Sequence, residues 1–505
     1  KLSHPKLPPS GTDQPAVLIL GEAPGRVEDE EGEQFVGESG QLLRKHIPAK
    51  WLKRIRFDNT IRCRPPENRD PQQVETECCR LFLVGDIERT RPKAIFGMGN
   101  FPLQWVLGQN GIMKWRGRRV PVRVGSHTCW FFPMIHPAVV IHNNKRTSWE
   151  SKEEHVFKLD LRHAFDYVLS LPEPVVHTRE QVFSGTSTVD WKRPGAAREV
   201  VSFLERASNT PEAGLDLETD RLRPYHPESR ILSVAVAVPG QSTAFPLDHP
   251  ESRWSSGDRE TLHAALNKFI RAPVRKVVHN QAFEMEWLAF KFGDPGRPES
   301  YYELLHASEW GDSMCQAGIL DERTGSRYGQ DRESTDISCL GLGFVALNLF
   351  GVDIKSLSDV NRKDMASEPL SKVLPYNAVD AKYHLECFAA QRETLREQDL
   401  LGVYDMHMGR IPTVVLTQIK GLPRDSGVAD ALHTKMSKRV AEAARAIAKD
   451  PSVALYKTKF GADFNPASDQ SCVRMFRDIV GAREGASQNR DGTQSYSVTR
   501  PVLEK

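Results

Sequence analysis

The sequence has no apolar run long enough to cross a membrane, which takes about 20 residues, and no signal peptide is visible. It also lacks an excess of charge of one sign, since 68 Lys and Arg stand against 66 Asp and Glu. Only local basic clusters can therefore indicate a nucleic-acid partner. Eight cysteines are scattered along 505 residues, which favours a reducing compartment over a disulfide framework. We expect a cytoplasmic protein with no membrane partner.

The chain is long enough for two or three domains. We assign the first to residues 1–168, where apolar runs such as VLIL and KAIFGM alternate with stretches of helical spacing. This alternation predicts a parallel sheet covered by helices. Residues 169–195 are rich in Pro, Ser, Thr and Gly and predict a linker. A second α/β domain is expected at 196–400, and residues 401–505 have mostly helical spacing.

Four motifs of the first domain follow or end predicted strands, so we expect them at one edge of the sheet. They are GEAPG at 21–25, GEQFVGESG at 32–40, DNTIRCRPPENR at 58–69 and MIHPA at 134–138. In this order they closely resemble the family 4 uracil-DNA glycosylases, over roughly residues 15–165. The resemblance implies an enzyme that holds an extruded uracil in a snug pocket and hydrolyses its N-glycosidic bond.

This resemblance, together with side-chain chemistry, gives five residues an expected role. Phe35 offers a ring to stack on uracil, and the amide of Asn59 supplies both a donor and an acceptor for its edge. His136 is expected to donate a hydrogen bond to the uracil oxygen that gains charge as the bond breaks. Glu22 matches a residue near the sugar, where it positions water or stabilises an oxocarbenium-like state. Glu28 matches a residue near C5 of the base, where thymine carries its methyl group.

Basic side chains cluster beside these motifs and either contact DNA phosphates or form an ordinary solvated face. The cluster consists of Arg44, Lys45, Lys50, Lys53, Arg54, Arg56, Arg62, Arg64 and Arg69. Some members of the family insert a basic, His-containing loop before the His-Pro motif and become covalently trapped on DNA. The stretch WRGRRVPVRVGSHTCWFFPMIHPA has no obvious insert, so ordinary turnover is expected.

Two cysteines, Cys63 and Cys79, match positions that hold a [4Fe–4S] cluster in this family, whereas the adjacent Cys78 is expected to serve packing. Such a cluster needs four thiolates. The family's other two lie in a CxxC just upstream of the first strand, and residues 1–16 contain no cysteine. Either the intact protein begins earlier and carries a structural cluster, or the cluster was lost and these are buried thiols.

Four carboxylates and a tyrosine of the second domain fall into three ordered motifs. GLDLETD places Asp216 and Glu218 on one side of a strand. HNQAFEMEWL places Glu284 at a helix start, and LPYNAVDAKYHLECF places Tyr376 and Asp380 on one helical face. Carboxylates brought together repel one another unless cations neutralise them, and oxygen ligands suit Mg²⁺ or Mn²⁺. Two such ions stabilise the attacking and leaving oxygens of a phosphodiester.

This ordered set resembles the DEDDy 3′–5′ exonucleases of the RNase H-like fold, specifically the proofreading domain of family A DNA polymerases, over roughly residues 195–400. The resemblance implies that the four carboxylates bind metal and that Tyr376 orients the attacking water. The second motif usually carries Asp where Glu284 stands. The longer side chain can still reach a metal, so exonuclease activity is expected.

Residues 408–436 resemble the segment after the exonuclease in family A polymerases, and FNPASDQSCVRMF resembles the entry to their thumb. The polymerase catalytic carboxylates are absent from the sequence, so we expect a fragment of a longer chain that continues into a polymerase module, as in phage-like fusions.

The predicted fold class is α/β: a uracil-DNA glycosylase-like parallel-sheet sandwich, an RNase H-like exonuclease domain and a mainly helical C-terminal segment. The predicted function is DNA repair and replication in a bacterial or phage-infected bacterial cell, through uracil excision and trimming of DNA 3′ ends. The alternative is a non-catalytic sensor of template uracil attached to a polymerase.

Overall fold

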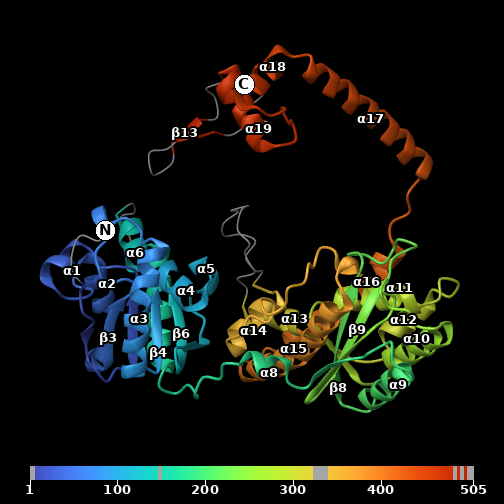
Figure 1. Ribbon diagram of the computed structural model, residues 1–505, viewed down its shortest axis with the longest axis horizontal. Helices are drawn as coiled ribbons and strands as arrows, with labels where there is room; N and C mark the ends of the chain where they lie inside the picture. Colours follow the sequence, from blue (N-terminus) through green and yellow to red (C-terminus); the bar gives the residue numbers. More distant parts are fainter. Residues whose placement is uncertain (1–5, 146–150, 322–338, 482–485, 489–493, 497–505) are drawn as a thin grey trace. The chain divides into compact units, whose positions relative to one another are not determined.

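The computed structural model describes residues 6–145, 151–321, 339–481, 486–488 and 494–496 (Figure 1). The chain forms two compact units, Lys1–Lys420 and Gly421–Lys505. The first unit contains two six-stranded sheets. We call the parts built on these sheets the first and the second domain.

The sheet of the first domain has the strand order β1-β3-β2-β4-β6-β5. Its four central strands are parallel to one another, and the two outer strands run antiparallel to their neighbours. The strands are β1 Ser10–Gly11, β2 Val17–Gly21, β3 Ile55–Asn59, β4 Ala94–Met98, β5 Val120–Val124 and β6 His127–Met134. The predicted parallel sheet is therefore confirmed.

Helices cover both faces of this sheet because successive residues of each strand point to opposite sides. Val17 and Ile19 of β2 pack in one core with Phe157, whereas Leu18 and Leu20 pack in another with Leu83. The result is a three-layer sandwich. Its helices are α1 Arg26–Glu31, α2 Glu38–His46, α3 Gln73–Thr90, α4 Asn100–Leu107, α5 Ile112–Trp115, α6 Pro137–Asn144 and α7 Lys152–Tyr167, with the short 3-10 helices η1 Ala49–Arg54 and η2 Pro66–Asn68.

The sheet of the second domain has the order β12-β11-β8-β9-β10-β7. Three parallel strands, β12, β11 and β8, are followed by an antiparallel meander of β8, β9 and β10. The strands are β7 Thr186–Thr188, β8 Glu212–Thr219, β9 Ile231–Val238, β10 Gln241–Pro246, β11 Arg275–Val278 and β12 Trp310–Asp312.

Part of the stretch 169–195, expected as a linker, is built into this second domain. It forms helix α8 Arg179–Phe183 and strand β7, which pairs in parallel with β10. Lys382 Nζ donates to the carbonyl oxygens of Gln181 and Ser184, at 2.6 and 2.9 Å. A composition rich in turn residues therefore did not reveal that the segment completes a sheet edge.

Helix α15 Leu370–Glu397 lies directly against β8 and β9, where it brings its motif to the sheet. A Cβ atom at Gly214 would come within 2.3 Å of the carbonyl oxygen of Ala381, so only glycine permits this approach. Pro375 lies in the second turn of this helix, where its missing N–H removes one backbone hydrogen bond.

The remaining helices of the first unit surround this arrangement. They are α9 Ala196–Ala207, α10 Ser256–Arg271, α11 Gln281–Phe292, α12 Glu299–Leu305, α13 Ser313–Leu320, α14 Leu342–Phe350 and α16 Leu401–Lys420, with the 3-10 helix η3 Met365–Ser367. Val415 of α16 shares a core with Met285 of α11, so this unit extends past the expected boundary at residue 400.

The second unit is mainly helical, which confirms that part of the predicted fold class. It contains α17 Ser426–Ala448, α18 Pro451–Phe460, α19 Asp469–Arg474, the π-helix η4 Met475–Val480 and a pair of short strands, β13 Ala486–Gln488 and β14 Gln494–Tyr496. None of the helices described in either unit is long and apolar enough to span a bilayer.

Candidate active sites

The first candidate site lies at the carboxyl ends of the parallel strands of the first domain. Glu22 follows β2, Asn59 ends β3 and His136 follows β6, as the sequence predicts. Backbone hydrogen bonds join the loops there: Thr60 N donates to Gly21 O at 2.9 Å, and Ile61 N donates to Glu22 O at 3.2 Å. The strand order thus brings residues from distant motifs to one sheet edge.

Phe35 and Asn59 meet above Gly21. A Cβ atom at Gly21 would come within 2.6 Å of Phe35 Cζ and 2.2 Å of Asn59 Oδ1, so both side chains occupy the space that the glycine leaves open. Phe35 has a φ of 56°, a left-handed conformation that is rare for an aromatic residue. Arg44 holds this backbone, because its Nε donates to Phe35 O at 2.9 Å and its Nη2 to Gln34 O at 3.0 Å.

His136 is a neutral hydrogen-bond donor at this edge. Its Nδ1 accepts from Ala138 N at 3.1 Å at the start of α6, which leaves the ring proton on Nε2. Burial lowers the pKa of His136 to about 4, so the ring is uncharged at neutral pH.

The two glutamates of the site differ in their surroundings. Burial, together with the negative charge of Asp70, raises the pKa of Glu22 to about 7. Glu28 Oε1 accepts from Gly37 N at 2.8 Å and so ties α1 to the loop that carries Phe35. The structure therefore gives Glu28 a loop-closing contact, and its expected place near C5 of a base stays a prediction. The sequence analysis did not select Asp70, because this residue lies one position beyond the DNTIRCRPPENR motif at 58–69.

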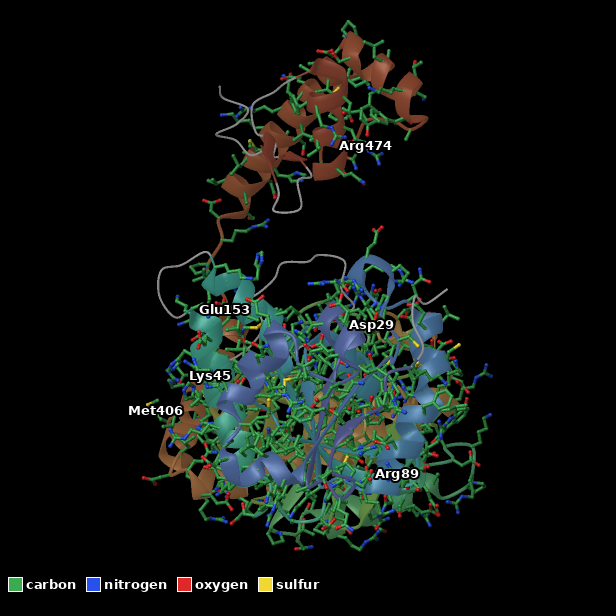
Figure 2. All side chains as sticks on the ribbon, turned by 90° about the vertical axis from the view of Figure 1, so that its left-hand side faces the viewer. Asp29, Lys45, Arg89, Glu153, Met406 and Arg474 are labelled. Carbon is green, nitrogen blue, oxygen red and sulfur yellow. The ribbon has the colours of Figure 1, made fainter. Side chains whose placement is uncertain are left out.

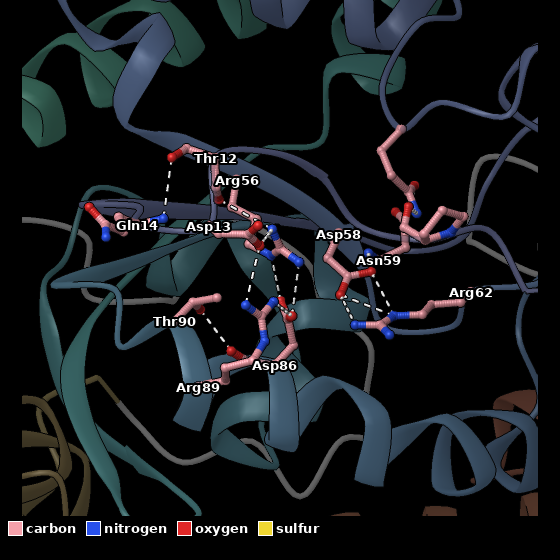
Figure 3. Close-up of polar contacts among 12 residues, drawn as sticks. Thr12, Asp13, Gln14, Arg56, Asp58, Asn59, Arg62, Asp86, Arg89 and Thr90 are labelled. Atoms are coloured by element: carbon pink, nitrogen blue, oxygen red, sulfur yellow. Dashed lines mark hydrogen bonds and ion pairs between the residues drawn. The ribbon is translucent and has the colours of Figure 1, made fainter.

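The basic cluster divides into internally bonded and exposed members. Arg64 and Arg69 are partly buried and donate to Asn68 and Glu75. Arg44, Arg56 and Arg62 make hydrogen bonds inside the domain, the last two to the carboxylates of Asp86 and Asp58 (Figure 3). The exposed members are Lys45, which Figure 2 labels, Lys50, Lys53 and Arg54. Only the exposed side chains remain candidates for contacts with phosphate.

The two cysteines Cys63 and Cys79 share a shallow cavity of about 360 Å³ with Cys78 and Lys6. Burial, with the neighbouring Cys79, raises the pKa of the Cys63 thiol. Both side chains are buried, whereas Cys78 is exposed. Two adjacent thiols facing one cavity fit two of the four ligands of a [4Fe–4S] cluster.

The second candidate site gathers Asp216 and Glu218 from β8 and Asp380 from α15. One carboxylate oxygen of each lies within 4.8 Å of the others. Burial, with the charge of Asp380, raises the pKa of Asp216 to about 7, and burial raises the pKa of Glu218 well above its ordinary value. Proximity of buried carboxylates is costly unless cations compensate it, so this donor set fits Mg²⁺ or Mn²⁺.

Glu284 lies beside this set on α11. Its side chain is buried, and within the described chain its Oε2 has no hydrogen-bond partner. Burial, followed by the charge of Asp216, raises its pKa well above the ordinary value. It does not belong to the group of three whose oxygens lie within 4.8 Å of one another. An unpartnered buried carboxyl oxygen next to three carboxylates fits a further ligand.

Three residues that the sequence analysis did not select support this site. Asn377 Nδ2 donates to Asp216, and His384 Nε2 lies 3.4 Å from Asp216 Oδ1. Lys355 Nζ donates to Tyr376 Oη at 2.5 Å and also to Asp380. Burial strongly raises the pKa of Tyr376, which keeps its hydroxyl protonated. The histidine and the asparagine could have been found from their helical spacing to Asp380, whereas no local pattern marks Lys355.

Comparison with known proteins divides the chain in the same way. Residues 8–159 match the uracil DNA glycosylase superfamily, and residues 196–396 match a 3′–5′ exonuclease family. The type-4 uracil-DNA glycosylase of Archaeoglobus fulgidus is 34% identical over 29% of this chain and 77% of its own length. The type-4 enzyme of Sulfurisphaera tokodaii is 31% identical over 32% of this chain and 80% of its own.

Among solved structures, Escherichia coli RNase D, an exoribonuclease involved in structured RNA processing, is 14% identical. The match covers 46% of this chain and 51% of that one, with a TM-score of 0.32.

Proposed function

Since this chain belongs, through its first domain, to the type-4 uracil-DNA glycosylases and also carries a 3′–5′ exonuclease domain, we propose that it excises uracil from DNA and trims DNA 3′ ends. The observation that carries the first activity is the neutral His136 ring, whose Nε2–H is free of the contact that occupies Nδ1. We propose a glycosylase domain at 1–168 and an exonuclease domain at 196–400, to which helix α8, strand β7 and helix α16 are added because they pack with it.

In the glycosylase site, each residue acts on one part of an extruded deoxyuridine. Phe35 stacks on the base and Asn59 hydrogen-bonds its edge. His136 Nε2–H donates to the uracil oxygen that becomes negative as the N-glycosidic bond breaks. The ionised Glu22 stabilises positive charge on the sugar and orients the water that attacks C1′. Uracil and an abasic site are the products.

In the exonuclease site, Asp216, Glu218, Glu284 and Asp380 would hold divalent cations. When bound, these ions would neutralise the carboxylates and polarise the phosphodiester. The protonated Tyr376 orients the attacking water. Lys355, which contacts both Tyr376 and Asp380, fixes the hydroxyl and adds positive charge beside the scissile phosphate.

We also infer a structural [4Fe–4S] cluster held in part by Cys63 and Cys79, with two further thiolates as ligands. Because residues 408–436 resemble the segment that follows the exonuclease in family A polymerases, we propose that the protein acts with a polymerase module of that family. Iron and sulfide analysis checks the first inference, and primer extension checks the second.

The decisive experiment measures release of radiolabelled uracil from an oligonucleotide. We expect release by the wild-type protein and a loss of about 100-fold or more in His136→Ala. Tight binding of uracil-containing DNA without release would overturn the glycosylase proposal in favour of the sensor. Trimming of a labelled primer in the presence of Mg²⁺, with Asp216→Ala as the control, tests the exonuclease separately.

A further inference from the structure

Gln34 is fully buried beside the base pocket, and no role has yet been given to it. It precedes Phe35 in the GEQFVGESG motif, and its backbone carbonyl is held by Arg44. Its side chain reaches two places. Nε2 lies 3.4 Å from Leu7 O and 3.3 Å from Pro8 O, and Oε1 accepts from Asn59 Nδ2 at 2.6 Å.

The donors and acceptors in these contacts determine how the amides of Gln34 and Asn59 are oriented. A backbone carbonyl can only accept, so Leu7 and Pro8 require the NH₂ group of Gln34 on their side. Gln34 Oε1 must then face Asn59, and a carbonyl oxygen there requires the NH₂ group of Asn59. The orientation of the Asn59 amide is therefore set by the backbone of residues 7 and 8, through one intervening glutamine.

The other end of the Asn59 amide faces the space above Gly21. Asn59 Oδ1 points into the space beside the Phe35 ring, and within the described chain no donor meets it. Turning the amide by 180° would set Oδ1 against Gln34 Oε1, two acceptors at hydrogen-bond distance. That arrangement forfeits the 2.6 Å bond and leaves two buried oxygens unpaired.

We propose that Gln34 is a positioning residue that locks the Asn59 amide in the orientation which accepts uracil and rejects cytosine. Uracil presents an N3–H donor next to the O4 acceptor, and this matches Oδ1 and the remaining N–H of the locked amide. Cytosine presents an N3 acceptor next to an N4–H₂ donor, which is the reverse pattern. A flipped amide would match cytosine, and Gln34 prevents the flip. This inference rests on the proposed glycosylase function.

The test compares 5-fluorouracil and 5-fluorocytosine in otherwise identical single-stranded oligonucleotides under single-turnover conditions. Fluorine makes both bases better leaving groups, so both rates fall in a measurable range. Gln34→Met has a similar length, and its thioether sulfur is only a weak hydrogen-bond acceptor. We expect it to lower the ratio of the uracil rate to the cytosine rate by about 10- to 100-fold.

Two variants separate the lock from a general effect on the pocket. Gln34→Glu keeps an acceptor for Asn59, and as a buried neutral acid it can still donate to a carbonyl, so its ratio should stay within about 3-fold of wild type. Gln41→Met removes an exposed amide that donates to Val36 O at 3.0 Å in the same loop, and should leave the ratio unchanged.

An unchanged ratio in a folded Gln34→Met protein overturns the inference, and so does an equal loss in Gln34→Glu. Should Gln34→Met not fold, the wild-type side-chain amide of Asn59, labelled with ¹⁵N and assigned by its loss in Asn59→Asp, decides the question. Slow hydrogen exchange of the Nδ2 proton bonded to Gln34 Oε1 supports a locked amide, and exchange as fast as that of the exposed Gln41 amide overturns it. Absence of uracil release by the wild-type protein would instead refute the proposed function itself.

Discussion

At the residue scale, burial drives both acid–base groups of the glycosylase pocket towards their neutral forms. It raises the pKa of the Glu22 carboxyl and lowers the pKa of the His136 imidazole. The effect on His136 is complete at neutral pH, so the ring can only donate its Nε2 proton. The pKa of Glu22 is raised only to about 7, so acid and carboxylate forms coexist at neutral pH.

This difference predicts a pH dependence for uracil excision. If the ionised Glu22 is the active form, as proposed, the single-turnover rate should rise with pH and level off above about 7. Asp70→Asn removes a negative charge that raises this pKa, so the rising limb should move to lower pH. Glu22→Gln should abolish the pH-dependent rise and lower the single-turnover rate by about 100-fold. A limb that stays in place in Asp70→Asn would show that another group titrates.

Lys355 is the residue whose removal should separate positioning from metal binding in the exonuclease site. Lys355→Met removes the donor to Tyr376 and the partner of Asp380, and we expect primer trimming to slow by about 10- to 100-fold at saturating Mg²⁺. Lys372→Met is the matched control, because Lys372 lies on helix α15, which also carries Tyr376 and Asp380, and pairs with the exposed Asp359 and the partly buried Glu368. Equal rates in the two variants would remove Lys355 from the mechanism.

At this scale, sequence reasoning found residues that belong to local motifs and missed those that act through contacts between distant segments. The Asp216 and Glu218 pair follows from strand periodicity, and Asp380 from the helix that contains it. Gln34 contacts Asn59 across 25 positions, and Lys355 contacts Asp380 across the same separation. Nothing in the intervening sequence specifies that these side chains meet, since their proximity is a product of the whole packing arrangement.

At the element scale, a network of buried ion pairs fixes β3 against α3 and so supports the strand that ends in Asn59. Arg56 of β3 donates to both oxygens of Asp86 on α3, at 2.6 and 2.9 Å, and Arg89 donates to the same carboxylate at 2.7 Å (Figure 3). Asp13 contacts the same two arginines from the exposed side. The parallel order of the strands was predictable from alternating patterns, whereas this polar bracing was not.

Asp86→Asn should destabilise the protein by about 3 kcal/mol, because it leaves the buried Arg56 without its buried charged partner and with the exposed Asp13 alone. Asp13→Asn, which removes an exposed partner of the same arginine, should cost less than about 1 kcal/mol. Urea unfolding followed by the near-ultraviolet signal of the domain's tryptophans measures both values. Similar losses in the two variants would contradict the assignment of the bracing to the buried pair.

The pKa of Asp86 determines how its contribution to the free energy of unfolding depends on pH. Burial alone would raise the pKa of Asp86, but hydrogen bonds from Arg56 and Arg89 outweigh it and leave the pKa below its ordinary value. The stabilisation is then fully present above about pH 4 and is lost as the pH falls below it, because the unfolded chain binds the proton first. The stability difference between wild type and Asp86→Asn should therefore shrink in acid.

At the scale of the whole molecule, the two candidate sites differ in how much negative charge they gather. The glycosylase pocket avoids net charge, with a neutral histidine and a partly protonated glutamate. The exonuclease site concentrates carboxylates on β8 and α15, and among the described residues one buried oxygen of the adjacent Glu284 has no hydrogen-bond partner. The first arrangement is complete without an ion, and the second is not.

This contrast predicts that chelation separates the two activities. EDTA should abolish primer trimming and leave uracil release within about 2-fold of its original rate, because every group proposed for excision belongs to the chain itself.

Mg²⁺ at about 100 times its dissociation constant should stabilise the wild-type protein by about 2.7 kcal/mol, seen as a rise in its unfolding temperature, and should not stabilise Asp216→Ala. That variant should release uracil normally, whereas Glu22→Gln should trim primers normally. Loss of uracil release in Asp216→Ala, at unchanged folding of the first domain, would show that the two sites act as one.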